Sequence, residues 1–313
     1  MSGPRSIAML ALAVCVSTAC AAGGDPGPSA TGGEDGGSFP ITMRPANGPV
    51  EIPERPERIV SLSATSTEIL FAIGAGEQVA AVDETSNYPP EAPVTNLSGL
   101  DPNVEALVAY DPDLVVMSED PGEVVASLEQ LDVPPVVHPA AETFEDVYGQ
   151  IEQLGRATGH NSEARDLVAS MRTRIEELAG SVPPEANGLT YYHELDDTFF
   201  TVTSETFIGQ VYGTVGLANI ADSAKGASSG YPQLSAEYII DENPDLIFLA
   251  DTKCCGITAE SVAERPGWNA IEAVRSGDVV PLDDDVASRW GPRVVDFLET
   301  VAAAVNARVE EAA

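Results

Sequence analysis

The 313-residue sequence has few basic residues, few histidines and few cysteines. Only 15 residues are lysine or arginine against 50 aspartates and glutamates, which gives a formal net charge of −35. A chain this acidic repels nucleic acid and anionic lipid headgroups, so no nucleic-acid partner is expected. Because the acidic residues are spread along the chain and not collected in a tail, they predict a strongly hydrated surface.

The three histidines are scattered, which disfavours a site for a bare zinc or manganese ion. We therefore expect no resident metal and no cofactor. A bare-metal-binding protein of similar architecture remains the main alternative among binding proteins. Of the four cysteines, Cys254 and Cys255 are adjacent, so an oxidising compartment would permit a vicinal disulfide between them. Since such a ring is strained, two free thiols are the other interpretation.

No apolar run approaches the roughly 20 residues that a membrane-spanning helix needs. The ten-residue run Ile7–Val16 follows Arg5 and predicts a signal peptide over residues 1–19. Cys20 resembles the cysteine of a bacterial lipobox, which implies lipid modification there and anchoring to the outer face of the cell membrane. An ordinary signal peptide with Cys20 near the cut by chance is the alternative. Residues 20–45 are rich in glycine, proline and polar residues, which predicts a flexible linker.

From residue 58 onward, strand-like and helix-like segments alternate. This alternation predicts a mainly parallel sheet covered by helices. Thr65 and Glu68 match a capping box, which predicts a helix start at Thr65, and Gly74 is expected to end that helix. The expected strands are 58–62, 79–82, 114–117, 136–137, 189–192 and 247–249.

Residues 143–180 interrupt this alternation with two amphipathic helices, the second of which Asn161 is expected to cap. The fold class is therefore α/β, with two lobes joined by a helical connector. The predicted boundaries are an N-terminal lobe at 46–142, the connector at 143–180 and a C-terminal lobe at 181–313.

An internal repeat relates the two lobes. In one copy Glu105 precedes Pro112 by seven residues, and in the other Glu237 precedes Pro244 by the same distance. Each proline lies in a [D/N]-P-D-L motif that opens an expected strand, and proline there stops the preceding helix.

Six segments, in this order between about residues 57 and 307, resemble the iron-siderophore and vitamin B12 substrate-binding proteins of ABC importers. The resemblance implies two Rossmann-like lobes bridged by one long helix, with the ligand in the cleft between them. It also implies that the chain is a monomer whose partners are an ABC permease with its ATPase and a ferric siderophore or cobalamin-type complex. The segments are RIVSLSATSTEILFAIGAG, SNYPPE, NVEALVAYDPDLVV, GLANIAD, YPQLSAEYIIDENPDLIFL and GDVVPLDDDVASRWGPRVVDFL.

Ligands of open α/β sheets bind outside the carboxyl ends of the strands, so contact residues are expected there. The resemblance places Tyr231 and Asp285 against a corrin ring, but Thr85, Gly99 and Ser118 stand where that site would have large rings. Arg289 and Arg293 are candidates to hold an anionic siderophore. The expected ligand contacts are Thr65, Ser66, Thr85, Tyr88, Ser118, His193, Tyr231, Asp285, Arg289 and Trp290.

Several of these residues have a second interpretation. Trp290 also fits core packing, and the neighbouring Arg293 fits a salt bridge between the lobes. His193 and Glu194 also fit a polar pair at a strand end that faces water.

The resemblance implies that Glu105 and Glu237 contact the permease, one from each lobe. Both also fit a structural role in a first helical turn, where a carboxylate is favoured by the helix dipole. A sensor or adhesin with the same binding domain would not need these two glutamates for docking.

The rival class is an exported hydrolase, because Gly226–Gly230 fits the pattern G-x-S-x-G. A nucleophile elbow needs a strand before this motif and a helix after it, whereas the flanking residues predict a loop. All three histidines also precede Ser228, while α/β-hydrolases place the catalytic histidine last.

Overall fold

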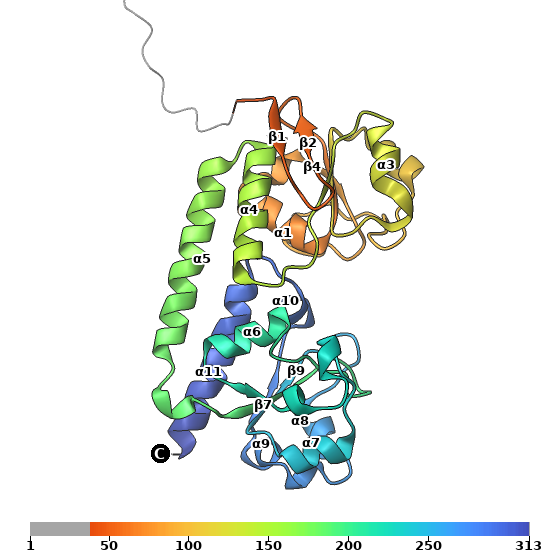
Figure 1. Ribbon diagram of the computed structural model, residues 1–313. Helices are drawn as coiled ribbons and strands as arrows, with labels where there is room; N and C mark the ends of the chain where they lie inside the picture. The colour runs from red at the N-terminus through yellow and green to blue at the C-terminus, as the bar shows by residue number, and fades with distance from the viewer. Residues whose placement is uncertain (1–37, 313) are drawn as a thin grey trace, which may run out of the picture. The chain divides into compact units, whose positions relative to one another are not determined.

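The computed structural model describes residues 38–312, so the predictions for the signal peptide and Cys20 lie outside the described residues. The N-terminal lobe is built on a four-stranded parallel sheet in the order β4-β3-β5-β6. Figure 1 shows this lobe in orange and yellow. Short apolar runs form these strands, and β3 is buried along its whole length because strands pair with it on both sides and helices pack on both faces of the sheet. The strands are β3 (Ile59–Leu62), β4 (Val79–Val82), β5 (Leu114–Met117) and β6 (Pro135–Val137).

Three helices follow these strands, and a small hairpin precedes them. The helices are α1 (Ala64–Ala72), α2 (Val104–Val108) and α3 (Val124–Glu129). The hairpin pairs β1 (Ile41–Met43) with β2 (Val50–Ile52) in antiparallel fashion. Strand β1 lies within residues 20–45, so the prediction of a flexible linker is wrong at Ile41–Met43.

The C-terminal lobe repeats the arrangement with a parallel sheet in the order β10-β9-β7-β8. The strands are β7 (Thr190–Glu194), β8 (Ala218–Asn219), β9 (Leu246–Leu249) and β10 (Val279–Pro281). The helices of this half are α6 (Phe207–Thr214), α7 (Ala236–Glu242), α8 (Ala259–Ala263), α9 (Glu272–Ser276), α10 (Asp284–Ser288) and α11 (Val294–Ala312).

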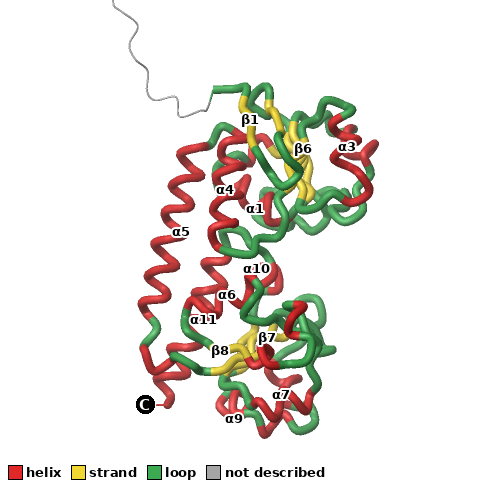
Figure 2. The backbone as a smooth tube through the Cα atoms, in the orientation of Figure 1, coloured by secondary structure: helices red, strands yellow, loops and turns green. Residues whose placement is uncertain are grey.

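The connector consists of α4 (Phe144–Thr158) and α5 (Asn161–Ser181), which pack against each other, and α11 packs along α5 (Figure 2). Gly159 ends α4 in the left-handed region at φ 80°, where glycine is favoured. The capping prediction for Asn161 is wrong, since Asn161 is the first helical residue and His160 holds the cap position without a side-chain bond. In the part of the chain that the structure describes, no helix is long and apolar enough to cross a bilayer.

One hydrophobic core runs through both lobes and the connector. It joins Val116 of the first sheet to Phe248 of the second through Ile151, Val168 and Val301 on helices α4, α5 and α11. The opposite faces of the two sheets have separate clusters. Because relative movement of the lobes would disturb this shared core, we expect modest closure on ligand binding.

The N-cap predicted at Thr65 is wrong by two residues. Ser63 is the N-cap of α1, and its hydroxyl accepts a hydrogen bond from the backbone N–H of Ser66. Glu68 therefore lies beyond the first turn and takes no part in a capping box. The helix ends as expected, with Gly74 at φ 84° just after it.

The internal repeat has a structural explanation. Asp111 and Asn243, which precede the two prolines, both adopt left-handed backbone conformations, at φ 51° and 49°. The carboxylate of Asp113 accepts a backbone N–H just before β3, at 3.0 Å. Asp245 does the same at the first residue of β7, at 2.8 Å. Each motif thus ends a helix, turns the chain and fixes the next strand against its neighbour.

Candidate functional site

A cavity of about 350 Å³ lies between the lobes. The N-terminal lobe contributes residues at the carboxyl ends of β3, β4 and β5, and the C-terminal lobe contributes α10 and the two residues after it. This is the edge where parallel sheets bind ligands. The lining residues are Leu62, Ser63, Ala64, Thr65, Asp83, Glu84, Thr85, Gly99, Leu100, Ser118, Asp285, Ser288, Arg289 and Trp290.

Six of the ten predicted contact residues line this cavity, namely Thr65, Thr85, Ser118, Asp285, Arg289 and Trp290. Leu100 and Ser288 also line the cavity but are not among the predicted contacts. Leu100 lies in a loop, and Ser288 is the last residue of the short helix α10. Neither position carries a residue type that marks a binding site, so no signal in the sequence points to them.

Two of the remaining predictions are corrected by burial. Ser66 is buried in the first turn of α1, below the cavity wall. His193 is fully buried in the C-terminal lobe, where its Nδ1 lies 2.7 Å from the hydroxyl of Tyr212. This burial lowers the pKa of His193 to about 3, so the imidazole is neutral at physiological pH. Its position on a strand covered on both faces keeps it out of the cleft.

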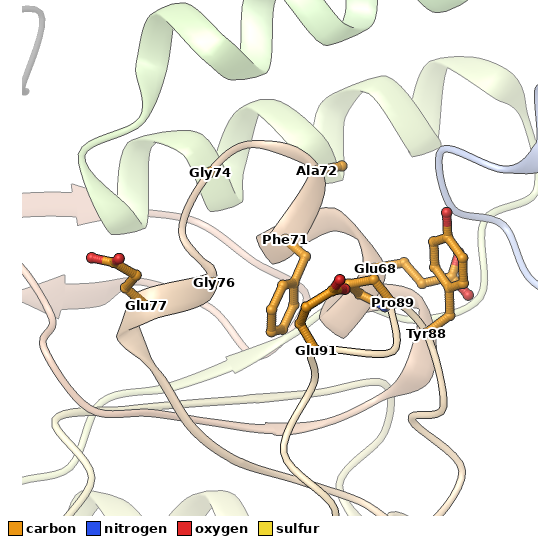
Figure 3. A pocket seen from close by; sticks show the side chains of 9 residues that line it. All are labelled: Glu68, Phe71, Ala72, Gly74, Gly76, Glu77, Tyr88, Pro89 and Glu91. Atoms are coloured by element: carbon orange, nitrogen blue, oxygen red, sulfur yellow. The ribbon is translucent and has the colours of Figure 1, made fainter.

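The two other predictions, Tyr88 and Tyr231, concern exposed aromatic residues. Tyr88 lines a separate cavity of about 650 Å³, beside α1, together with Phe71, Pro89 and Glu91 (Figure 3). The guanidinium group of Arg293 lies over the ring of Tyr88, with its Cζ 4.1 Å from the ring centroid. Tyr231 is 49% exposed in a loop and is not among the residues that line the inter-lobe cavity.

Arg289 is committed to contacts within the protein. Its Nη1 donates to Glu68 at 2.8 Å and to Asn87 at 2.9 Å. Its Nη2 donates to the carbonyl of Thr85 at 2.9 Å and to Asp285 at 2.8 Å. Since both terminal nitrogens already have two acceptors, Arg289 is a wall of the cavity and not the free anion-binding group that the sequence analysis expects.

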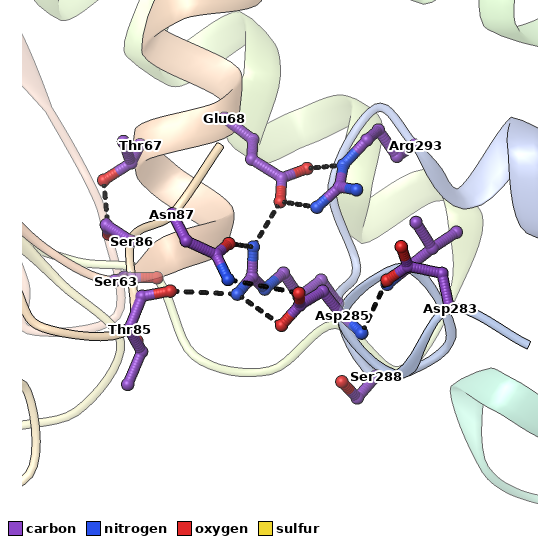
Figure 4. Close-up of polar contacts among 12 residues, drawn as sticks. Ser63, Thr67, Glu68, Thr85, Ser86, Asn87, Asp283, Asp285, Ser288 and Arg293 are labelled. Carbon is purple, nitrogen blue, oxygen red and sulfur yellow. Dashed lines mark hydrogen bonds and ion pairs between the residues drawn. The ribbon is translucent and has the colours of Figure 1, made fainter. Parts of the chain in front are cut away.

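Arg293 completes the same cluster. Its Nε and Nη2 donate to the two carboxylate oxygens of Glu68, at 2.9 and 2.5 Å, and the two residues face each other in Figure 4. These bonds raise the pKa of Arg293. The interpretation of Arg293 as a salt bridge between the lobes is therefore confirmed. Trp290 combines both of its interpretations, because it packs against the shared core and also lines the cavity.

The loop that contains the two adjacent cysteines is tied to the cavity wall. Cys254 and Cys255 form a vicinal disulfide and are exposed. The backbone N–H of Cys254 donates to Asp284 at 2.9 Å. The ammonium group of Lys253 lies 2.9 Å from Asp285, which lines the cavity. The disulfide loop is thus held against α10 by charge-assisted hydrogen bonds.

The small residues at the cavity wall follow from tight packing. A Cβ added at Gly99 would lie 2.9 Å from the carbonyl oxygen of Leu62 and 3.2 Å from the carboxylate of Asp83. An aromatic side chain at position 99 would therefore displace backbone. Thr85 is fixed in turn by its hydroxyl, which donates to Asp83 at 2.5 Å. Ring stacking of the kind implied for a corrin site is absent from these positions.

Within residues 38–312 the cavity wall carries more negative than positive charge. Asp83, Glu84 and Asp285 line it, and Arg289 is the single basic residue among the lining side chains. Because Arg289 is already paired with carboxylates, the field inside the cavity is expected to disfavour anions.

The two glutamates of the internal repeat occupy equivalent positions. Glu105 and Glu237 are the second residues of α2 and α7 and are both exposed. The helices begin alike, since the side chains of Asn103 and Ser235 each accept the backbone N–H three residues later. Neither glutamate carboxylate forms a hydrogen bond or ion pair with another described residue, so their equivalence is not explained by contacts within the chain.

A buried charged cluster in the C-terminal lobe was missed. Glu194 is fully buried, and its two carboxylate oxygens accept hydrogen bonds from Nη1 and Nη2 of Arg265, each at 2.6 Å. The interpretation of Glu194 as facing water is therefore wrong. Asp251 is also fully buried, and neither of its carboxylate oxygens has a hydrogen-bond partner among the described residues. Burial, followed by the neighbouring charge of Glu194, raises the pKa of Asp251 to about 7.

The geometry disfavours the rival functions. Ser228 of the G-x-S-x-G pattern lies in a single 3-10 turn between Gly226 and Gly230, both with positive φ, and not between a strand and a helix. Among the described residues no group of three or more His, Cys, Asp or Glu side chains is placed to hold a metal ion. His138 and His193 are both buried.

Comparison with known proteins agrees with this architecture. The family model of periplasmic binding proteins matches residues 59–286. The ABC transporter substrate-binding lipoprotein YvrC of Bacillus subtilis, itself uncharacterized, is 30% identical over 85% of this chain and 86% of its own. The cobalamin-binding protein of Halobacterium salinarum is 30% identical over 86% of this chain and 75% of its own.

A solved structure gives the same result for the fold. The periplasmic heme-binding protein RhuT from Roseiflexus sp. RS-1, in apo form, superimposes with a TM-score of 0.70 and 25% identity. The match covers 81% of this chain and 99% of that one. Two α/β lobes, a helical connector, a cavity between the lobes and these matches together show that the chain belongs to the periplasmic binding protein family, whose members bind substrates for transport.

Proposed function

We propose that this protein is the extracytoplasmic substrate-binding component of an ABC importer and that it holds an organic complex of iron or cobalt between its lobes. The observation that carries the proposal is the cavity, which both lobes line at the carboxyl ends of the first sheet's strands. A ligand there would contact both lobes at once. A permease that also contacts both lobes could therefore distinguish the ligand-bound protein from the ligand-free one. The protein acts as a monomer whose partners are the permease and its ATPase.

The charge of the cavity favours some members of this ligand class over others. Carboxylates outnumber the one basic side chain on the wall, and that side chain is already paired. A corrinoid with an amide periphery or a neutral ferric hydroxamate adds no negative charge to this space. A ferric catecholate or a heme with two carboxylates would bring anions next to Asp83 and Glu84 without a free cation to receive them.

Ligand binding should quench the fluorescence of Trp290, since this ring lines the cavity. Trp268, the only other tryptophan, is buried in a different cluster of the C-terminal lobe. We expect cyanocobalamin or a neutral ferric trihydroxamate to quench the protein, and Trp290→Phe to lose most of that signal. Calorimetry would measure binding to both proteins independently of fluorescence. Binding of zinc or manganese ions, with no response to any complex, would contradict the proposal.

We further propose that the first 19 residues are a signal peptide and that Cys20 carries the lipid that anchors the protein to the cell membrane. The relative from Bacillus subtilis is named a lipoprotein, which supports this assignment. Cys20→Ala should move the protein from the membrane fraction to the soluble extracytoplasmic fraction. Cys15→Ala, inside the apolar run, is the matched control and should stay membrane-bound. An anchor elsewhere would leave both variants in the membrane fraction.

A further inference from the structure

Glu68 occupies an unusual position for a carboxylate. It lies in the middle of α1, is 2% exposed, and accepts hydrogen bonds from Arg289 and Arg293, which follow it by 221 and 225 residues. Its side chain also borders the 650 Å³ cavity, while Arg289 borders the inter-lobe cavity. Glu68 thus stands directly behind the one basic residue of the inter-lobe cavity wall.

Without Glu68, Arg289 at this wall and Arg293 beside it would lose the carboxylate that they share, which leaves an excess of positive charge next to the cavity. Asp285 could neutralise only part of it, because Asp285 is shared with Lys253 at 2.9 Å and with the amide of Asn87 at 3.1 Å. A guanidinium group released into a partly buried site is a strong binding group for carboxylates and catecholate oxygens. A guanidinium group that is already paired with Glu68 no longer binds carboxylates or catecholate oxygens in this way.

We infer that Glu68 determines the charge selectivity of the cavity: by pairing with Arg289 and Arg293 and offsetting one of their two positive charges, it excludes anionic metal complexes and admits neutral or cationic ones. This inference rests on the proposed function and names a residue that selects among its ligands. Glu68 reaches the ligand through the arginines, so it acts as a positioning residue. A purely structural role would predict loss of stability on substitution but no change in preference between ligands of different charge.

The test uses the mature protein and three probes: a neutral ferric trihydroxamate, a triply anionic ferric tricatecholate and cyanocobalamin. Glu68→Gln keeps the shape of the side chain and removes its charge. We expect the ratio of affinities, anionic over neutral, to rise by about tenfold or more in this variant. Glu68→Gln with Arg289→Gln removes one charge of each sign and should return the ratio toward the wild-type value. Glu176→Gln, on the exposed face of α5, makes the same charge change away from the site and should leave the ratio unchanged.

An unchanged ratio in folded Glu68→Gln would overturn the inference while leaving the proposed function intact. Should that variant fail to fold, Arg293→Gln supplies the opposite change, because it leaves the cluster more negative. This variant should bind the anionic probe more weakly relative to the neutral one, and an unchanged ratio would again overturn the inference. If neither the wild type nor Glu68→Gln binds any probe, the proposed function itself fails and the inference fails with it.

Discussion

Replacing both Glu105 and Glu237 with alanine should abolish uptake while leaving the affinity for the ligand unchanged. The two carboxylates are exposed at equivalent positions of the two lobes and form no hydrogen bond or ion pair with another described residue. A permease with two related halves could pair one cationic side chain with each of them. Charge pairs of this kind control partner choice and association rate as well as affinity.

The measurement is transport in vesicles containing the reconstituted permease and ATPase, beside ligand titration of the same protein. A carboxylate in a first helical turn also stabilises its helix, by about 0.3–1 kcal/mol. Glu260→Ala controls for that effect, because Glu260 is exposed at the second position of α8 but lies outside the repeat. It should transport normally. Normal transport by the double variant would remove the docking role, and loss of ligand binding would assign the two glutamates to the fold.

Six of the eight strands in the two parallel sheets could be predicted because their signals are local, whereas β8 and β10 are not among the expected strands. Each [D/N]-P-D-L motif combines a left-handed residue, a proline and a strand-fixing aspartate within four positions, and the structure confirms both strands that they open. The apolar runs that form β3, β4 and β5 are similarly self-contained. Where a short segment determines its own backbone conformation, its secondary structure can be predicted from the sequence.

The inter-lobe cluster could not be predicted in the same way. Thr65 and Glu68 fit the local pattern of a capping box, but the carboxylate of Glu68 accepts hydrogen bonds from two arginines more than 200 residues away in the sequence. The strength of two charge-assisted contacts exceeds that of a cap, so the distant partners determine where the carboxylate lies. The same contacts explain why Arg289, a reasonable candidate for anion binding, is not free.

The burial of polar residues at the end of β7 could not be predicted for a different reason, namely that helices cover both faces of the sheet. On a strand exposed to water on one face, alternation tells which residues are buried. Tyr191, Tyr192, His193 and Glu194 are all buried, because helices cover both faces of the C-terminal sheet. Polarity therefore gave the wrong answer for His193 and Glu194. The signal that could have located Glu194 is Arg265, one of only 15 basic residues, but nothing in the sequence pairs them.

Substituting Arg265 with methionine should lower the free energy of unfolding by about 3–5 kcal/mol near neutral pH, the usual loss when one partner of a buried ion pair is removed. Arg265 binds both oxygens of Glu194, and its guanidinium also lies 4.6 Å from the ring centroid of Trp268. Methionine keeps much of the apolar contact, so the loss reports mainly on the charge. Chemical denaturation would measure it.

The pH dependence of this loss follows from Asp251. In the wild type its pKa is about 7 in the folded protein against an ordinary value of 3.8, because burial and Glu194 favour the protonated form, while Arg265 acts in the opposite direction. An acid with a raised folded pKa contributes stability that is full below pH 4 and is lost as pH rises to 7. Removing Arg265 should raise the pKa of Asp251 further, so the Arg265→Met defect should grow above pH 7 and shrink on acidification.

Asp251→Asn is the companion variant, and it should raise the free energy of unfolding where Arg265→Met lowers it. Asparagine stays neutral, so the cost of ionising a buried carboxyl beside Glu194 and Tyr192 disappears, and the variant should exceed the wild type by on the order of 4 kcal/mol at pH 8. At pH 4 the two proteins should have nearly equal stability. The buried neutral histidines, whose pKa values are lowered to about 3 and 4, destabilise both proteins equally in acid, so the difference between the curves isolates Asp251. A difference that does not change between pH 4 and pH 8 would mean that Asp251 is already ionised at pH 4, with Arg265 balancing both carboxylates.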